Sequence, residues 1–174
     1  MAEKAVLVSI RPEWVQKILS GVKTVEVRKK RPQIYRPFKL YIYCTKPKDI
    51  LLSIIKDGEE IYGDTYHGSP IFVKTARDAP YGAGGMVAAE CLCYNIFDID
   101  VPFGGKELGT CLTPKQMYEY AGGKSRLYGL ELSDVKRYRH PIPVTDFQFY
   151  GCTDHVKRPP QSWMYVNEKP DAGR

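Results

Sequence analysis

A basic segment near the N-terminus, SGVKTVEVRKKRP (residues 20–32), combines residue types that can bind phosphate or move a proton. Its one acid, Glu26, stands among five basic residues and close to Lys23 and Arg28. A carboxylate beside a lysine and an arginine can help to hold a phosphate, or can take part in proton transfer if burial shifts the pKa values. The same three residues could instead form an exposed row of ion pairs. Spacing alone leaves both alternatives open.

A strand and a helix precede the three side chains and must help to position them. Residues 5–10 (AVLVSI) are typical of a buried strand, and Pro12 suits the first turn of a helix that follows. Gly21 predicts the end of that helix as a left-handed cap. The helix has one apolar face, formed by Trp14, Val15, Ile18 and Leu19.

A second strand follows the helix directly. The β-branched residues of the stretch 24–27 predict it. Because Glu26 and Arg28 are two positions apart, they share one face of this strand. Lys23 lies in the turn before the strand, where alternation does not fix its direction. We therefore expect Lys23, Glu26 and Arg28 to line one cleft beside the helix.

The rest of the chain is typical of a single α+β domain, residues 1–174, with a β-rich core. The strand expected over residues 38–45 is half-buried, because apolar and other residues alternate along it. Further strands are expected over residues 86–101, 127–138 and 144–151. A helix with a Thr N-cap and a Gly stop is expected over residues 113–123. A short helix over residues 48–56 would lie in an insertion or long loop (47–84), and residues 167–174 would form a tail.

Several familiar motifs are excluded. The sequence GGKS (residues 122–125) lacks the earlier glycine and the preceding strand of a phosphate-binding loop. Cys91 and Cys93 share one face of a strand, and no further Cys or His recurs at metal-ligand spacing. Buried structural thiols are therefore the favoured interpretation. The sequence predicts no metal site and no cofactor.

The positive charge is concentrated in the first third of the chain. Residues 1–60 hold 13 Lys+Arg and 7 Asp+Glu, whereas residues 61–174 are balanced. A localised basic surface is typical of a protein with a phosphate-rich partner, although a solvated charged face gives the same pattern. The sequence lacks a long apolar run, a signal peptide and a secreted cysteine pattern. We therefore expect a cytoplasmic protein without a membrane partner, and its oligomeric state stays open.

The segment SIRPEWVQKILSGVKTVEVRKKRP (residues 9–32) resembles the opening of the ASCH domain family, which belongs to the PUA-like superfamily. The shared pattern is a strand, a helix that ends in glycine, and a Lys-Thr-x-Glu-x-Arg strand; its matches are Gly21, Lys23, Thr24, Glu26 and Arg28. The resemblance extends to a phage and bacterial subgroup through YIYCTK (41–46), GMVAAE (85–90) and RPPQSWMYV (158–166). Residues 47–84 do not align.

The resemblance implies a PUA-like, partly open β-barrel with two or three flanking helices and a cleft for RNA or a nucleotide-like ligand. Four basic residues could then position a nucleic-acid backbone: Lys29, Lys30, Arg31 and Arg36. Three aromatic residues are candidate stacking surfaces, with core packing as the alternative: Tyr41, Tyr43 and Trp163.

Some relatives in this family are enzymes. One bacterial group hydrolyses the amide of an acylated cytidine with a lysine in the Gly-x-Lys-Thr stretch, a threonine and a glutamate. Lys23 matches that lysine, Glu26 stands where the threonine would be, and Glu119 is one candidate for the glutamate. Another relative is described as a ribonuclease. Three alternatives thus stay open: a binding module, a hydrolase with Lys23 and Glu26 as catalytic residues, and an interaction domain whose motif only stabilises the fold.

Overall fold

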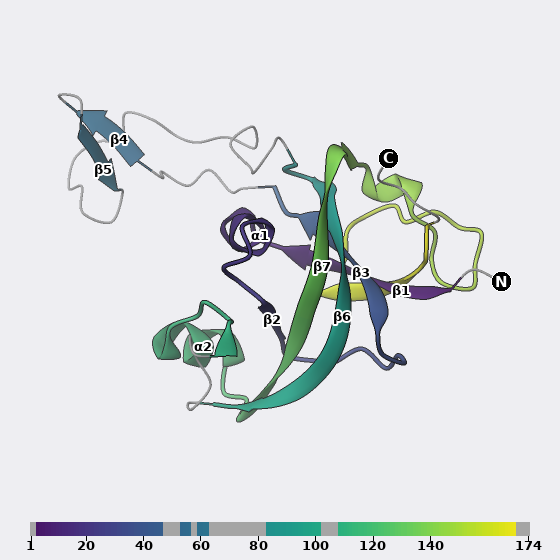
Figure 1. The fold of residues 1–174 in the computed structure, drawn as a ribbon, viewed down its shortest axis with the longest axis horizontal. Helices are drawn as coiled ribbons and strands as arrows, with labels where there is room; N and C mark the ends of the chain where they lie inside the picture. The colour runs from purple at the N-terminus through teal and green to yellow at the C-terminus, as the bar shows by residue number, and fades with distance from the viewer. Residues whose placement is uncertain (1–2, 47–52, 57–58, 63–82, 102–107, 170–174) are drawn as a thin grey trace.

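The computed structural model of the chain describes residues 3–46, 53–56, 59–62, 83–101 and 108–169 (Figure 1). Its main element is a six-stranded sheet, which two α-helices accompany within these residues: α1 (Pro12–Leu19) and α2 (Pro114–Ala121). This arrangement confirms the predicted α+β class.

The large sheet is mostly antiparallel and open. Its strands are β1 (Lys4–Ile10), β2 (Val25–Arg28), β3 (Phe38–Cys44), β6 (Met86–Asp100), β7 (Arg126–Ile142) and β8 (Trp163–Asn167), in the order β2-β7-β6-β3-β1-β8. Only β1 and β3 among these pair in parallel. No ladder of backbone hydrogen bonds joins the end strands β2 and β8 in this sheet, which confirms a fold that is not fully closed.

Side chains connect β8 to the segment that follows β2. The indole nitrogen of Trp163 donates to the carbonyl oxygen of Lys30 at 2.9 Å. The hydroxyl of Tyr165 accepts from the backbone nitrogen of Gln33 at 2.6 Å and donates to its carbonyl oxygen at 3.1 Å. The gap between the two ends of the sheet is therefore bridged by a few specific bonds.

Both helices form where their end signals predict them. Pro12 occupies the first turn of α1, and Val15 and Ile18 are buried against the sheet. In α2, Thr113 and Gln116 form a capping box, and Gly122 ends the helix with a positive φ of 58°.

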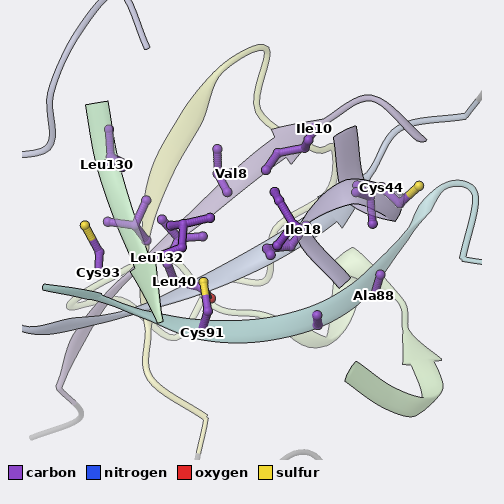
Figure 2. Close-up of a cluster of buried hydrophobic side chains, with 14 of the residues drawn as sticks. Val8, Ile10, Ile18, Leu40, Cys44, Ala88, Cys91, Cys93, Leu130 and Leu132 are labelled. Carbon is purple, nitrogen blue, oxygen red and sulfur yellow. Dashed lines mark hydrogen bonds between the residues drawn. The ribbon is translucent and has the colours of Figure 1, made fainter. Parts of the chain in front are cut away.

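Both faces of the large sheet are buried over β3. Side chains of α1 pack on one face with residues of β1, β3, β6 and β7 (Figure 2). Tyr41 and Tyr43 point to the opposite face, where they pack with Tyr138 and Phe147. The expectation of a half-buried strand here is wrong, because the chain around the 3-10 helix Val144–Asp146 covers the second face.

The predicted strand over residues 144–151 is also wrong. Its first residues form the 3-10 helix Val144–Asp146, and the rest makes isolated bridges at Gln148 and Phe149. Pro143, which has no N–H to donate, stands directly before it. The strand is found later, in the aromatic segment Trp163–Asn167, which pairs with β1.

A second, two-stranded sheet pairs β4 (Ser53–Lys56) with β5 (Glu59–Tyr62). The helix expected over residues 48–56 is therefore wrong for residues 53–56, where Ile54 and Ile55 are β-branched and favour a strand. Residues 48–52 lie outside the described part of the chain.

Cys91 and Cys93 are buried and reduced, as the sequence predicts. Burial raises the pKa of the Cys93 thiol to about 12, so it stays protonated at neutral pH. Across the described residues, no group of three or more His, Cys, Asp or Glu is placed to hold a metal ion. No helix in this part of the chain is both long and apolar enough to cross a membrane.

Candidate functional site

A cleft of about 2020 Å³ lies beside β2 and is lined by residues from both helices and from the segment 159–163. Figure 1 shows α1 and α2 set apart, with β2 between them. Three polar side chains form the bottom of this cleft: Lys23, Glu26 and Arg28, which are 3%, 6% and 6% exposed. The structure therefore brings together the three residues of the basic segment that the sequence placed in one cleft.

Lys23 is held in place by acceptors from two segments far apart in the sequence. Its ammonium group donates to the carbonyl oxygens of Val25 at 2.8 Å and Thr110 at 2.6 Å, and lies 3.4 Å from Oε2 of Glu26. The ring of Trp14 lies 5.4 Å from the same nitrogen. The three acceptors match the three hydrogens of an ammonium group.

Burial lowers the pKa of Lys23, while the carboxylate of Glu26 raises it and opposes this effect. The lysine is thus easier to deprotonate than an exposed one, although its neighbours favour the charged form.

Arg28 completes the row at the bottom of the cleft. Its Nη2 lies 2.8 Å from Oε1 of Glu26 and donates to the carbonyl oxygen of Ser9 at 2.7 Å. Its Nε, in contrast, is buried and has no hydrogen-bond partner among the described residues. Burial raises the pKa of the nearby Tyr120 hydroxyl, and both the charge of Arg28 and a hydrogen bond with its side chain oppose that shift.

The backbone at Gly109 keeps the Thr110 carbonyl within hydrogen-bonding distance of the Lys23 ammonium group. The carbonyl oxygen of Gly109 accepts from the backbone nitrogens of Thr24 at 3.0 Å and Val25 at 3.1 Å. Gly109 has a φ of +73°, and a Cβ atom at this position would collide with Oγ1 of Thr24. Only glycine fits both the conformation and the close approach.

We expect the Gly109→Ala variant to lose about 2–5 kcal/mol of unfolding free energy, from left-handed strain and overpacking together. Gly123→Ala is the matched control, because Gly123 has a φ of +87° but no atom within 4 Å of the added Cβ. It should lose about 1–2 kcal/mol, from strain alone. Urea unfolding of both variants measures the difference, and equal losses would show that the Thr24 contact does not constrain the turn.

The other predicted site residues are divided between the cleft and the rest of the surface. Lys29 and Lys30 are exposed and line the cleft. Arg31 lies over the ring of Tyr128 at 5.8 Å, and Arg36 donates to the Ile96 carbonyl oxygen at 3.3 Å. Neither arginine is among the residues that line the cleft.

The three predicted stacking residues also differ in whether they line the cleft. Tyr41 is 0% exposed and packs edge to face on Phe147 at 4.9 Å between ring centroids, so it has no free face for a base. The stacking role expected for Tyr41 therefore does not fit its position in the core. Tyr43 is largely buried but touches the cleft, and Trp163 is half-buried and lines it.

Sequence reasoning missed several side chains of the cleft. Trp14, which the sequence assigned only to the apolar face of α1, and Tyr120 of α2 both line it. Gln116 of α2 lines it as well. Glu119, which the sequence offered as a candidate for the family glutamate, also lines the cleft, and it is 61% exposed with Lys115 at 4.0 Å. The amphipathic pattern of a short helix does not separate residues at the edge of the apolar face from those in the core.

Comparison with known proteins supports the resemblance read from the sequence. The family profile of the ASCH domain matches residues 8–143. The crystal structure of ASCH from Zymomonas mobilis is similar, with a TM-score of 0.60 and 20% identity, over 94% of this chain and 88% of that one. A tyrosine-to-phenylalanine variant of that protein gives a TM-score of 0.60 at 19% identity, over 95% and 92% of the two chains. At this identity the likeness concerns the fold. No curated protein matches the chain.

Proposed function

Because the chain belongs to the ASCH domain family, we propose that it is a binding module that holds RNA, or a nucleotide-like ligand, in the cleft above Lys23, Glu26 and Arg28. The family supplies the class of ligand, and the chemistry of the cleft supports it. The three residues at its bottom, two cations and one carboxylate, keep a net positive charge, so a ligand would be held by directed hydrogen bonds and by charge there, and by further charge nearer the opening.

The observation that carries this proposal is the unpartnered Nε of Arg28. A buried donor without an acceptor costs free energy, and native proteins rarely leave one unless a ligand or water completes it. Arg28 lines the cleft, so a small rearrangement of its side chain would bring this nitrogen, which is covered in the structure, to an acceptor atom of a base or a phosphate. A purely structural role for the motif would need no cleft beside the ion pairs.

The charge of the remaining lining supports an anionic ligand. Beyond the three residues at the bottom, the lining contains two acidic side chains, Glu13 and Glu119, and five basic ones: Arg11, Lys29, Lys30, Lys46 and Lys124. Such an excess attracts phosphate and raises the rate of association with it. Arg31 and Arg36, which lie outside the lining, would act on the ligand only at longer range.

The aromatic side chains of the cleft support a ligand with planar rings. Trp14, Tyr120 and Trp163 come from three different elements and all line it. Aromatic side chains of this kind bind unpaired bases by stacking, with little dependence on base identity. They replace Tyr41 in this role.

Salt-dependent binding of RNA tests the proposal. We expect random-sequence RNA to bind wild-type protein, and the Lys29→Glu/Lys30→Glu variant to bind at least about tenfold more weakly with a salt slope smaller by about 1.4, or about 0.7 for each lost phosphate contact. The charge-reversal variant Lys136→Glu/Arg139→Glu is the matched control, because both residues are exposed on β7 and do not line the cleft. Fluorescence anisotropy measures all three proteins, and equal losses in both variants would contradict a site in the cleft.

A hydrolase is the second candidate, and the buried Lys23 is the observation in its favour. Burial lowers the pKa of this lysine, and Glu26 lies 3.4 Å away, so the pair could supply a general base or nucleophile. The two backbone carbonyls that also hold the ammonium group favour a positioning role instead. Release of acid from an acylated nucleoside, or cleavage of RNA, by wild-type protein but not by Lys23→Ala would decide for the hydrolase.

A further inference from the structure

The cleft is larger than a site for one nucleotide needs to be. Small-molecule pockets usually measure roughly 300–1,000 Å³, and this cleft measures about 2020 Å³. Its lining also draws on five separate parts of the described chain: the end of β1 with α1, β2 with its flanking residues, the end of β3, α2 with its flanking residues, and the segment 159–163. This size and this composition suit an extended ligand.

Basic side chains stand at two separate places along the cleft. Arg11 and Lys46 follow the ends of β1 and β3, which lie together because these strands are parallel and Ile10 pairs with Cys44. Lys29 and Lys124 lie by the C-terminal end of α2, where a Cβ atom on Gly122 would be 3.3 Å from Nζ of Lys29. The two pairs are associated with the two helices that Figure 1 shows on either side of β2. Each pair could hold a different phosphate group.

Aromatic and hydrogen-bonding groups line the cleft together with these basic pairs. The ring of Trp163 is held by the bond from its indole nitrogen to Lys30 and by an edge-on contact with Tyr165 at 5.2 Å. Trp14 and Tyr120 contribute from the helices. A fixed ring can stack on a base without first losing its own conformational freedom.

The depth of the charged residues favours a single strand over a double helix as the ligand. The side chains of Lys23, Glu26 and Arg28 are at most 8% exposed, so only a small group that enters the cleft can reach them. Paired bases in a duplex are stacked on each other, and their faces are not available to Trp14 or Trp163. Unpaired bases meet both requirements.

We propose that the ligand is a single-stranded stretch of RNA several nucleotides long, with phosphates bound at both basic pairs and bases held between them. This inference rests on the proposed function and narrows it, because a free nucleotide could use only one of the two pairs. Glu13 and Glu119 also line the cleft, but the four basic residues of the two pairs outnumber these two acids.

The test compares ligand lengths by fluorescence anisotropy and competition. The probes are nucleoside monophosphates, random-sequence RNA of two, four, eight and twelve nucleotides, and a twelve-base-pair RNA duplex. We expect affinity to rise with length up to about four nucleotides, the lower end of the range for small single-strand-binding barrels. The duplex should bind at least about tenfold more weakly than the single strand of equal length.

Two charge reversals locate the phosphates. Arg11→Glu/Lys46→Glu and Lys29→Glu/Lys124→Glu should each weaken binding of the eight-nucleotide RNA at least about tenfold and reduce the salt slope by about 1.4. Lys136→Glu/Arg139→Glu should leave both values unchanged. All six residues are exposed, so the fold should tolerate the changes, and circular dichroism checks this. If a charge-reversal variant misfolds, both residues of that pair are changed to Gln instead. The Gln variant should then reduce the salt slope by at least half of the amount expected for the Glu variant.

The outcomes separate this inference from the proposed function. Monophosphates that bind as tightly as the eight-nucleotide RNA, sensitivity to only one basic pair, or equal affinity for the duplex would each overturn the single-strand inference while leaving a nucleotide-binding cleft. Failure of every probe to bind would overturn the proposed function itself.

Discussion

Replacing Glu26 with glutamine is expected to lower the free energy of unfolding by about 3–5 kcal/mol. Glu26 is the carboxylate that lies between Lys23, at 3.4 Å, and Arg28, at 2.8 Å, and all three side chains are buried. Glutamine has nearly the same shape but no charge, so two buried cations would face each other without compensation. The loss comes mainly from their uncompensated burial and mutual repulsion.

Urea unfolding at neutral pH measures this loss, and an exposed ion pair supplies the control. Asp98 lies 3.2 Å from Arg126, and both side chains are about half exposed. The Asp98→Asn variant should change the unfolding free energy by no more than about 1 kcal/mol. If Glu26→Gln changed stability as little, either Lys23 would lose its proton in the variant or water would reach the bottom of the cleft, and the Glu26 charge would not be needed to keep the two cations buried.

Replacing Arg28 with lysine is expected to weaken RNA binding by about 10- to 100-fold, which corresponds to about 1.5–3 kcal/mol for a hydrogen bond that involves a charged group. A lysine can keep the charge beside Glu26, but it has no second nitrogen in the position of Nε. The arginine fork is the feature that lets one side chain hold Glu26 and Ser9 and still offer a donor to a ligand.

Anisotropy titration on folded protein checks the Arg28→Lys variant, with its thermal unfolding recorded in parallel. Arg126→Lys is the control, because Arg126 is exposed and does not line the cleft. It should bind RNA as the wild type does. Full RNA affinity in a stably folded Arg28→Lys protein would show that Nε does not contact the ligand.

The positions of the helices and of the three central polar residues could be predicted from the sequence because local rules determine them. Pro12 and Gly21 mark the limits of α1, and Thr113 with its glycine stop marks α2. The two-residue period of a strand puts Glu26 and Arg28 on one face. The sequence left the direction of the Lys23 side chain open, and the structure places its Nζ 3.4 Å from Oε2 of Glu26.

The partners that hold these residues could not be predicted, because they are backbone atoms distant in sequence. Lys23 donates to the carbonyl of Thr110, 87 positions away, and Arg28 donates to that of Ser9. Every residue has a carbonyl group, so no residue type signals such a contact. The role of Tyr41 was misjudged for a related reason: alternation along β3 showed two faces, but not that a later part of the chain covers the second one.

The strand β8 was also missed, since two prolines precede it and its aromatic residues do not alternate clearly with polar ones. Its assignment depends on pairing with β1, in which Val8 lies opposite Trp163. Because β8 pairs with a strand at the other end of the sequence, its own residues carry no local pattern that predicts the pairing.

The position of β8 determines when the cleft can first be complete. Ser9 is hydrogen-bonded to Pro160 at 2.6 Å and Lys30 to Trp163 at 2.9 Å, so one side of the cleft is made by residues synthesised long after those they join. While the ribosome is still adding residues 159–163, the nascent chain can form its helices but has no complete recognition surface. These contacts join residues 151 and 133 positions apart, and contacts of such long sequence separation are typical of slow folding steps, so we expect the cleft to be completed late in folding.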